Sequence, residues 1–220
     1  MIRNRILPAL ALVAVTAGFA QAQNKVPLPL ELPKPLFVGT PVPIAVPNLE
    51  KPLGTKRPDF MAPAGTVLLS RDKPVTSSDA FPIIGELAFV TDGEKAGSDG
   101  TFVELGPAVQ WVQIDLEKSA AIHAIVIWHF HAQARVYHDV VVQVSDDPEF
   151  KTGVTTVFNN DHDNSGSLGA GKQMAYIETN EGKLIDAAGA TGRYVRLYSN
   201  GNTTDELNHY VEVEVFGIAK

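Results

Sequence analysis

The sequence contains no cysteine among its 220 residues, and basic side chains are fewer than acidic ones. Without cysteine there are no disulfide bonds and no thiol nucleophile, so packing alone must hold the core together. The formal net charge of −7 argues against nucleic acid and anionic membranes as partners, because both require clustered lysine and arginine. The long apolar run near the start, residues 6–19, is shorter than the roughly 20 residues of a membrane-spanning helix, so membrane insertion is not expected.

Sequence motifs of several enzyme classes are also missing. There is no Gly-x-Ser-x-Gly elbow, no phosphate-binding P-loop and no His-Glu-x-x-His metal motif. Two pairs of carboxylates, Asp146 with Asp147 and Asp161 with Asp163, have the spacing of turn residues rather than of a hydrolytic pair. The sequence therefore favours a binding protein without catalytic activity.

The first 22 residues have the pattern of a secretory signal peptide. Arg3 and Arg5 precede the apolar run, and Ala20-Gln-Ala22 provides a small-residue cleavage site. Since no cysteine follows the run, a lipid anchor is not expected. We therefore predict an exported protein, located in the periplasm or outside the cell, and the absence of disulfides favours a bacterial setting.

Residues 23–63 form a segment rich in proline. Ten of the fifteen prolines lie here, two to six residues apart, in runs such as 27–35 and 41–47. Such spacing blocks helix and removes backbone donors, so we expect an extended linker or arm. The segment is also rich in leucine, valine and isoleucine, which leaves two alternatives open. It is either a solvated spacer or an arm that packs on the domain or on an envelope protein.

The remaining chain, residues 64–220, has the pattern of an antiparallel β domain. Apolar and polar residues alternate in 110–116, which is the period of a half-buried strand. In the runs 122–131 and 137–147, apolar residues two positions apart, such as Ile125 with Ile127 and Val142 with Val144, share one face. The run Arg193–Ser199 alternates in the same way, with Val195 and Leu197 on the side opposite to Tyr194 and Arg196. No stretch in this region shows a sustained helical period. One all-β domain is therefore predicted.

Several short motifs occur in an order that resembles a known family. They are Trp111-Val-Gln-Ile-Asp-Leu, Val142-Gln-Val-Ser-Asp-Asp, Arg193-Tyr-Val-Arg-Leu-Tyr and Glu212-Val-Glu-Val-Phe-Gly. Together they resemble the discoidin family, also called coagulation factor 5/8 type C domains, over roughly residues 67–218. The resemblance implies a jelly-roll β-sandwich related to galactose-binding domains, mostly antiparallel, with the last strand beside the first. Such domains usually bind glycans, lipids or proteins.

The resemblance also implies a structural Ca²⁺ ion near the Asp92-Gly93 turn. Calcium takes oxygen ligands only. By motif position the side chains of Asp92 and Glu212 would bind it, together with the backbone carbonyls of Phe89 and Glu94, and Ser98 could complete the shell. The alternative is an ordinary Asp-Gly turn beside a glutamate that faces solvent.

Polar residues near predicted strand ends are the candidates for ligand binding. Planar polar groups suit the hydroxyl rim of a sugar, and an aromatic ring suits its apolar face. The resemblance favours a glycan or glycoconjugate held by His129, His131, Arg135, Asn159, Asp161 and His162, with Tyr137 or Tyr210 as the stacking ring. The loops expected to carry these residues also suit two other functions.

The first alternative is a protein-interaction or envelope-assembly module, in which the loops and the proline-rich arm contact a protein partner. The second is a transition-metal site. His129 and His131 would lie on the same face of a strand, and His162 would add a third ligand. Which sugar or partner is bound, and the oligomeric state, are left open by the sequence.

Overall fold

The structure is a computed structural model and describes residues 24–37, 39, 43–98 and 100–220. The predicted signal peptide, residues 1–22, lies outside the described residues, so export stays a prediction. Within those ranges the chain is almost entirely strands and loops, and its helical element is the short 3₁₀ segment η1 (Leu87–Thr91). No helix in the described part of the chain is long and apolar enough to cross a membrane.

Eleven strands are distributed over the described residues. They are β1 (Lys25–Pro27), β2 (Met61–Pro63), β3 (Val67–Leu68), β4 (Val75–Ser77), β5 (Val103–Leu105), β6 (Gln110–Trp128), β7 (Val141–Ser145), β8 (Thr155–Asn159), β9 (Lys183–Ser199), β10 (Asn208–Tyr210) and β11 (Glu212–Ala219). Seven of them form one antiparallel sheet in the order β3-β11-β6-β9-β7-β8, with β4 also paired to β6. Strands β5 and β10 pair with each other, as do β1 and β2.

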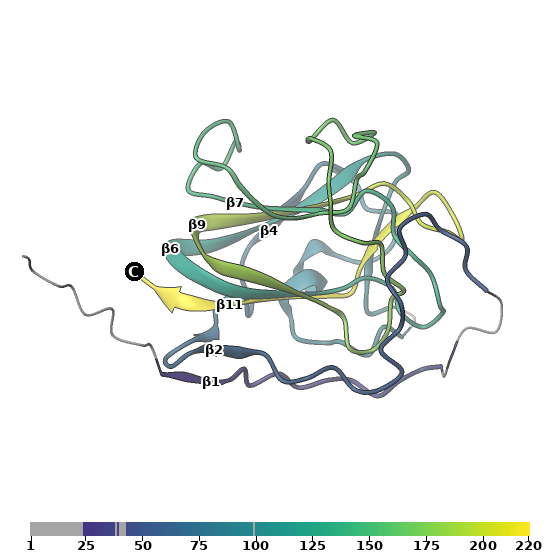
Figure 1. Cartoon of the computed structure of the whole chain (residues 1–220). Helices are drawn as coiled ribbons and strands as arrows, with labels where there is room; N and C mark the ends of the chain where they lie inside the picture. The colour runs from purple at the N-terminus through teal and green to yellow at the C-terminus, as the bar shows by residue number, and fades with distance from the viewer. Residues whose placement is uncertain (1–23, 38, 40–42, 99) are drawn as a thin grey trace, which may run out of the picture.

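The two long strands β6 and β9 belong to both layers of the sandwich (Figure 1). Their pairing shifts register between Asp115 and Ala120 and between Ile122 and Ala124. In this region Glu117 and Ala188 have positive φ, which interrupts the regular ladder and bends both strands. One end of the pair carries β4, β7 and β8, and the other carries β11 and β3. The sheet therefore folds over and faces itself.

The core fills the space between the two layers. Val112 and Ile114 come from one half of β6, and Ile125 and Ile127 come from the other half. All four side chains are fully buried in a single cluster, and Val195 also belongs to it. The alternation that the sequence predicts for these strands is confirmed, because every second side chain points into this cluster.

The proline-rich arm covers the outer face of the layer that contains β11. Leu28 and Ala62 are buried there against Val126, Trp128 and Phe216. In Figure 1 the pair β1–β2 lies directly below β11. The described part of the arm is therefore a third layer of the structure, because its apolar side chains contact the domain's own sheet.

Two predictions about strands are wrong in detail. The sequence predicts separate strands for residues 110–116 and 122–131, but β6 is one continuous strand. Irregularities in its pairing with β9 accommodate the bend, so no loop is needed there. The second run was expected to extend to His131, but β6 ends at Trp128. The expected pairing of the last strand with the first is confirmed, since Phe216 of β11 lies opposite Leu68 of β3.

Replacing Phe216 with alanine tests the layer beneath the arm. The ring is 1% exposed, so the cavity left in Phe216→Ala should lower the free energy of unfolding by about 3–5 kcal/mol. Phe81, which is 86% exposed, is the matched control, and Phe81→Ala should change stability by less than about 0.5 kcal/mol. Urea unfolding followed by circular dichroism measures both values. Equal midpoints for the two variants would show that the arm does not cover this face.

Candidate functional site

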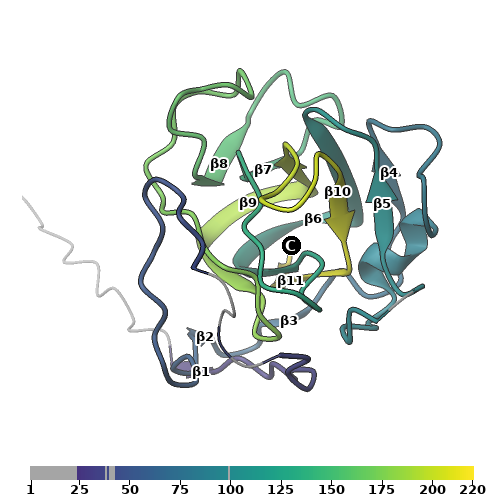
Figure 2. The same ribbon diagram turned by 90° about the vertical axis from the view of Figure 1, so that its right-hand side faces the viewer.

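Loops from distant parts of the sequence meet at one end of the sandwich. His138 and Gly201 are joined by a backbone hydrogen bond of 3.0 Å, and the amide of Asn160 donates to the carbonyl of Val140 at 3.1 Å. Figure 2 faces this end, with β5 and β10 in view. The loops after β6, β8 and β9 therefore lie side by side at this end of the sandwich.

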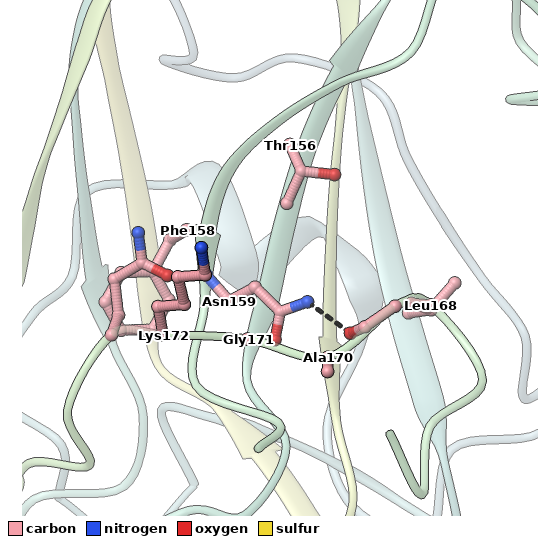
Figure 3. Close-up of a pocket in the computed structure, with 9 residues that line it drawn as sticks. Thr156, Phe158, Asn159, Leu168, Ala170, Gly171 and Lys172 are labelled. Atoms are coloured by element: carbon pink, nitrogen blue, oxygen red, sulfur yellow. Dashed lines mark hydrogen bonds between the residues drawn. The ribbon is translucent and has the colours of Figure 1, made fainter. Parts of the chain in front are cut away.

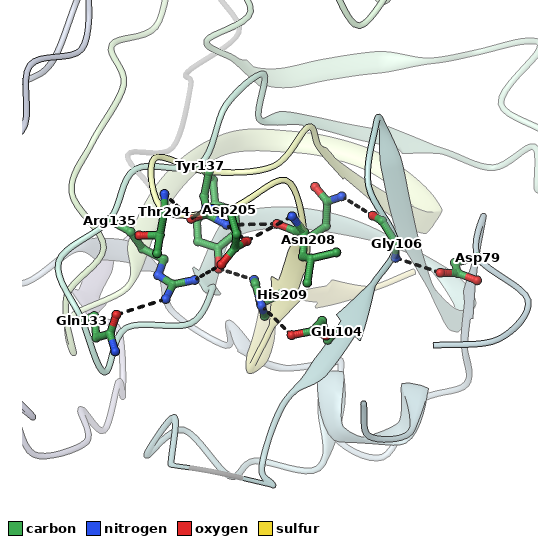
Figure 4. A network of polar contacts seen from close by, with 12 residues as sticks. Asp79, Glu104, Gly106, Gln133, Arg135, Tyr137, Thr204, Asp205, Asn208 and His209 are labelled. Carbon is green, nitrogen blue, oxygen red and sulfur yellow. Dashed lines mark hydrogen bonds and ion pairs between the residues drawn. The ribbon is translucent and has the colours of Figure 1, made fainter. Parts of the chain in front are cut away.

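A buried polar network lies beneath this surface (Figure 4). Strands β5 and β10 place Glu104 opposite His209, and the carboxylate oxygen Oε2 lies 2.9 Å from the imidazole Nε2. The other ring nitrogen of His209 lies 2.9 Å from the hydroxyl of Tyr137. Both nitrogens of His209 are thus used, and its orientation is fixed.

Burial is the main cause of the shifted pKa values of the ionisable groups in this network. Burial and, to a smaller extent, the nearby Arg135 guanidinium lower the pKa of His209 to about 4. The pKa of Glu104 is raised, mainly by burial and then by the Asp205 carboxylate. At neutral pH the imidazole is therefore neutral and serves as a hydrogen-bonding support for Glu104.

Arg135 is the cationic member of the group. Its guanidinium packs over the Phe130 ring at 4.7 Å and lies 3.5 Å from Asp205 Oδ2, an ion pair too long for a hydrogen bond. The contact between Nη2 and Gln133 Oε1 is 3.4 Å. Within the described part of the chain, Nε and Nη1 have no hydrogen-bond partner although both are buried. The oxygens of a hydroxylated or anionic ligand could accept hydrogen bonds from these unused donors of the buried guanidinium.

Apolar side chains border the network on the far side of β5. Phe81, Ile83 and Ile84 are 86%, 56% and 41% exposed. Ile83 donates to the carbonyl of Glu104 at 2.7 Å, and the amide of Glu104 donates to Ile84 at 2.9 Å. Sequence reasoning missed these residues and Glu104. The run Ala80-Phe-Pro-Ile-Ile84 between polar turns was the available signal.

The structure places His129 and His131 away from any shared ligand position. Both are fully buried beyond the end of β6. His129 Nδ1 lies 2.7 Å from Glu178 Oε1 and its ring stacks on Tyr137, whereas His131 Nε2 lies 2.8 Å from the carbonyl of Lys95. A shared metal site at these histidines, with His162 as third ligand, is therefore not formed. Their side chains serve separate buried contacts.

Neither predicted stacking ring is available to a sugar. Tyr137 is 1% exposed and Tyr210 is 0% exposed, and the Tyr210 hydroxyl donates to the carbonyl of Leu197 at 3.2 Å. A ring must present a free face to stack on a ligand. The prediction of Tyr137 or Tyr210 as the platform is corrected, because both strand-end tyrosines pack into the core.

Asn159, Asp161 and His162 lie on a different part of the same end. The Asn159 side chain donates to the carbonyl of Gly169 at 2.7 Å, and Asp161 Oδ2 accepts from the amide of Gly166 at 2.9 Å. These two buried side chains therefore shape their own loop, whereas His162 is exposed. Carboxylate oxygens of Asp139, Asp161 and Asp163 lie within 4.8 Å of one another, and no histidine belongs to that group in the described ranges.

An open groove runs beside this loop (Figure 3). Its volume is about 300 Å³, and it lies between β8 and the segment Leu168–Gln173. Phe158 and Leu168 give it an apolar side, and Thr156 and Lys172 give it polar groups. Of the eight residues predicted to bind a ligand, Asn159 lines this groove, whereas Arg135 lies in the network of Figure 4. The predicted ligand residues thus separate into two places.

The residues predicted to bind calcium lie in η1, in the loop that follows it and at the start of β11. Glu212 is buried; its Oε2 accepts from the amide of Gly93 at 3.0 Å, and its Oε1 has no partner among the described residues. Burial raises the pKa of Glu212 to about 9. Asp92 caps the end of η1, the 3₁₀ element that contains Phe89, and its Oδ1 accepts from the amide of Glu94 at 2.8 Å. Ser98 is exposed further along the same loop.

Arg71 is a competing cation at this position. Its Nη1 donates to the carbonyl of Asp92 at 2.6 Å, and the guanidinium covers Gly93 so closely that a Cβ there would overlap it. Asp92 and Glu212 offer carboxylate oxygens, and the buried Glu212 Oε1 has no hydrogen-bond partner among the described residues. These oxygens fit a hard cation such as Ca²⁺. Arg71 already supplies part of the positive charge that these carboxylates require.

Comparison with known proteins agrees with this architecture. Residues 90–197 match the F5/8 type C family model described as NedA-like, galactose-binding domain. No curated protein matches the chain. The family 89 glycoside hydrolase from Clostridium perfringens shares the fold at 15% identity and a TM-score of 0.51, over 70% of this chain and 15% of the hydrolase. This chain therefore corresponds to a small part of that enzyme.

Two smaller solved structures are similar over nearly their whole length. The CBM32 of AlyQ, in complex with 4,5-unsaturated mannuronic acid, is 18% identical over 66% of this chain and 96% of that chain, with a TM-score of 0.49. Chitosan-binding module 1 of the chitosanase/glucanase from Paenibacillus sp. IK-5 is 21% identical over 69% of this chain and 99% of the module, with a TM-score of 0.46. The family match over residues 90–197 confirms the resemblance that the motifs indicated: this part of the chain is similar to the discoidin, or F5/8 type C, family.

Proposed function

We propose that the loop end of the sandwich binds a glycan or glycoconjugate without transforming it, and that Arg135 is the central contact. The observation that supports the proposal is the Arg135 guanidinium, which is buried beside Asp205 and has two nitrogens without a hydrogen-bond partner among the described residues. An unpaired buried donor is costly, and a ligand oxygen would remove that cost.

The groups around Arg135 complement a ring of hydroxyls. Each hydroxyl both donates and accepts, so a sugar needs donors and acceptors on the same side. Arg135 and Gln133 supply donors, while Glu104 and Asp205 supply acceptors. The neutral His209 holds Glu104 in place from behind. A fixed arrangement of this kind lowers the entropy lost on binding.

Phe81 and its neighbours supply the apolar part of the site. The Phe81 ring is 86% exposed, and Ile83 and Ile84 connect it to Glu104 through backbone hydrogen bonds. The C–H face of a sugar ring can stack on such a side chain while its hydroxyls reach the polar groups. Phe81 thus takes the role that was predicted for Tyr137 or Tyr210. The family description as galactose-binding makes a galactose-like sugar the first ligand to test.

The variant Arg135→Lys tests the central contact. Lysine keeps the charge but lacks the planar fork that binds two oxygens, so affinity for the sugar should fall by about 10- to 100-fold. Arg193→Lys is the matched control, because Arg193 pairs with Asp115 at the bend of the long strands. Calorimetric titration with galactose, N-acetylglucosamine and uronic-acid oligosaccharides measures the change. Unaltered affinity in Arg135→Lys would place the ligand elsewhere, with the groove of Figure 3 as the next position.

Binding should be insensitive to pH from about pH 6 to pH 8. The pKa of a free histidine lies near 6.5, but burial holds that of His209 at about 4. The imidazole therefore stays neutral across this range, and the Glu104 support does not change. The same titrations repeated at three pH values check this. A loss of affinity as the pH falls through 6.5 would show that His209 takes up a proton in the free site.

We further propose that Ca²⁺ binds at Asp92 and Glu212 as a structural ion. The support is the buried Glu212 Oε1, which has no partner within the described ranges, next to the exposed Asp92 carboxylate. Carbonyls of Phe89 and Glu94 and the Ser98 hydroxyl are further oxygens of the same loop. An ion here would stabilise η1 and its loop against the start of β11.

Thermal unfolding with calcium and with chelator tests this ion. At about 100 times its dissociation constant, calcium should add about 2.7 kcal/mol to the free energy of unfolding. Glu212→Gln should abolish the calcium-dependent increase in melting temperature, because the Glu212 carboxyl can lose its proton to bind the ion as a carboxylate, whereas the amide stays neutral. Glu206→Gln, at an exposed position in the loop before β10, is the control and should retain it. A melting temperature that is the same with calcium and with chelator would contradict the proposal.

A further inference from the structure

The proline-rich arm is attached to one particular segment of the domain, residues 175–182, which leads into β9. At one end of the segment, Leu49 forms a parallel bridge with Ala175. The amide of Glu50 donates to the carbonyl of Ala175 at 2.8 Å, and the amide of Ala175 donates to the carbonyl of Asn48 at 3.0 Å. The arm thus adds a short piece of strand to a segment with no other strand pairing of its own.

Arg57 holds the other end of the same segment. Its guanidinium donates to the carbonyls of Glu181 and Gly182 at 3.0 and 2.8 Å, and its amide donates to the Glu181 carboxylate at 3.0 Å. The carbonyl of Pro33 accepts from the Asn180 side chain at 2.9 Å. Two stretches of the arm therefore converge on residues 180–182.

Glu178 lies between these two sets of contacts and connects them to the binding end. Its amide donates to the carbonyl of Arg135 at 2.9 Å, and its Oε1 lies 2.7 Å from His129 Nδ1. The Glu178 side chain is fully buried. The backbone position of Arg135 consequently depends on where segment 175–182 is held.

We infer that the arm, through Arg57 and residues 48–50, is a positioning element of the glycan site: it holds segment 175–182 so that Glu178 fixes the loop of Arg135. This inference rests on the proposed function of Arg135. Residues 175–182 are loop and turn apart from the single bridge at Ala175, so without the arm they would sample more conformations. A ligand would then have to order Arg135 on binding, which lowers affinity without removing any ligand contact.

The arm also covers the outer face of the β11 layer with apolar side chains, and these contacts are separate from those of Arg57. Leu28 and Ala62 bury the outer face of the β11 layer, whereas Arg57 makes polar contacts to the backbone of 181–182. Arg57→Ala therefore removes one anchor and leaves the apolar layer in place. Lys56→Ala is the matched control, because the Lys56 side chain is 72% exposed and its ion pair with Asp59 is 3.9 Å long.

Amide hydrogen exchange in the full chain tests the inference without any ligand. In Arg57→Ala the amides of Ala175 and Glu178 should exchange at least tenfold faster than in the wild type. Lys56→Ala should leave both rates unchanged. The core amides of Val142 and Val144 in β7 should also keep their rates in Arg57→Ala, which separates local release from general destabilisation. Calorimetric titration with galactose should show a several-fold weaker affinity in Arg57→Ala.

Each outcome has a distinct meaning. Unchanged exchange at Glu178 in Arg57→Ala would overturn the inference, and so would an equal acceleration of the Val142 and Val144 amides. Faster exchange at Glu178 with unaltered sugar affinity would also overturn it, since the segment would then not position Arg135. If the wild type binds none of the sugars tested, the proposed function fails by itself. The inference about a glycan site fails with it, while the exchange rates still show whether the arm holds the segment.

Discussion

The pairing of β6 with β9 is the interaction on which the rest of the structure depends. These strands are the two longest, and both run through both layers because positive-φ residues and register shifts bend them together. Strands β4, β7 and β11 each attach to one of these two. Because the pair folds over, Ile114 and Ile125 of the same strand face a common core. The loops of the candidate site follow the ends of these strands, so the bend also determines where those loops meet.

Burial governs the chemistry at that end more than the number of polar residues does. Glu104, His209 and Tyr137 form a continuous set of hydrogen bonds in which no water is needed to orient the histidine. The same burial keeps His209 neutral and raises the pKa of Glu104. Arg135 differs from these residues, because its hydrogen-bonding capacity is only partly used among the described residues. Arg135 thus has hydrogen-bond donors to spare, whereas both ring nitrogens of His209 are already used.

The arm shows how a proline-rich segment becomes part of a folded domain. Proline limits regular pairing, yet leucine at alternating positions supplies an apolar side that covers Trp128 and Phe216. Backbone groups that prolines leave free then bond to loops, as the Pro33 carbonyl does with Asn180. The family match begins at residue 90, so the arm lies outside it. An element outside the matched residues thus contacts segment 175–182, which in turn bonds to the backbone of Arg135.

The sequence by itself determined the all-β class, the alternating core of β6, β7 and β9 and the pairing of the last strand with the first, because a period of two is a local property of a strand. It also predicted Arg135 as a ligand contact, which stays a prediction, and it did not indicate Glu104 or Phe81. It misjudged His129, Tyr137 and Tyr210, whose positions near strand ends resemble those of exposed loop residues. Only the tertiary structure decided which of these side chains face solvent. Glu104 and His209 are 105 positions apart and meet only because β5 pairs with β10, and exposure depends on such distant neighbours rather than on local pattern.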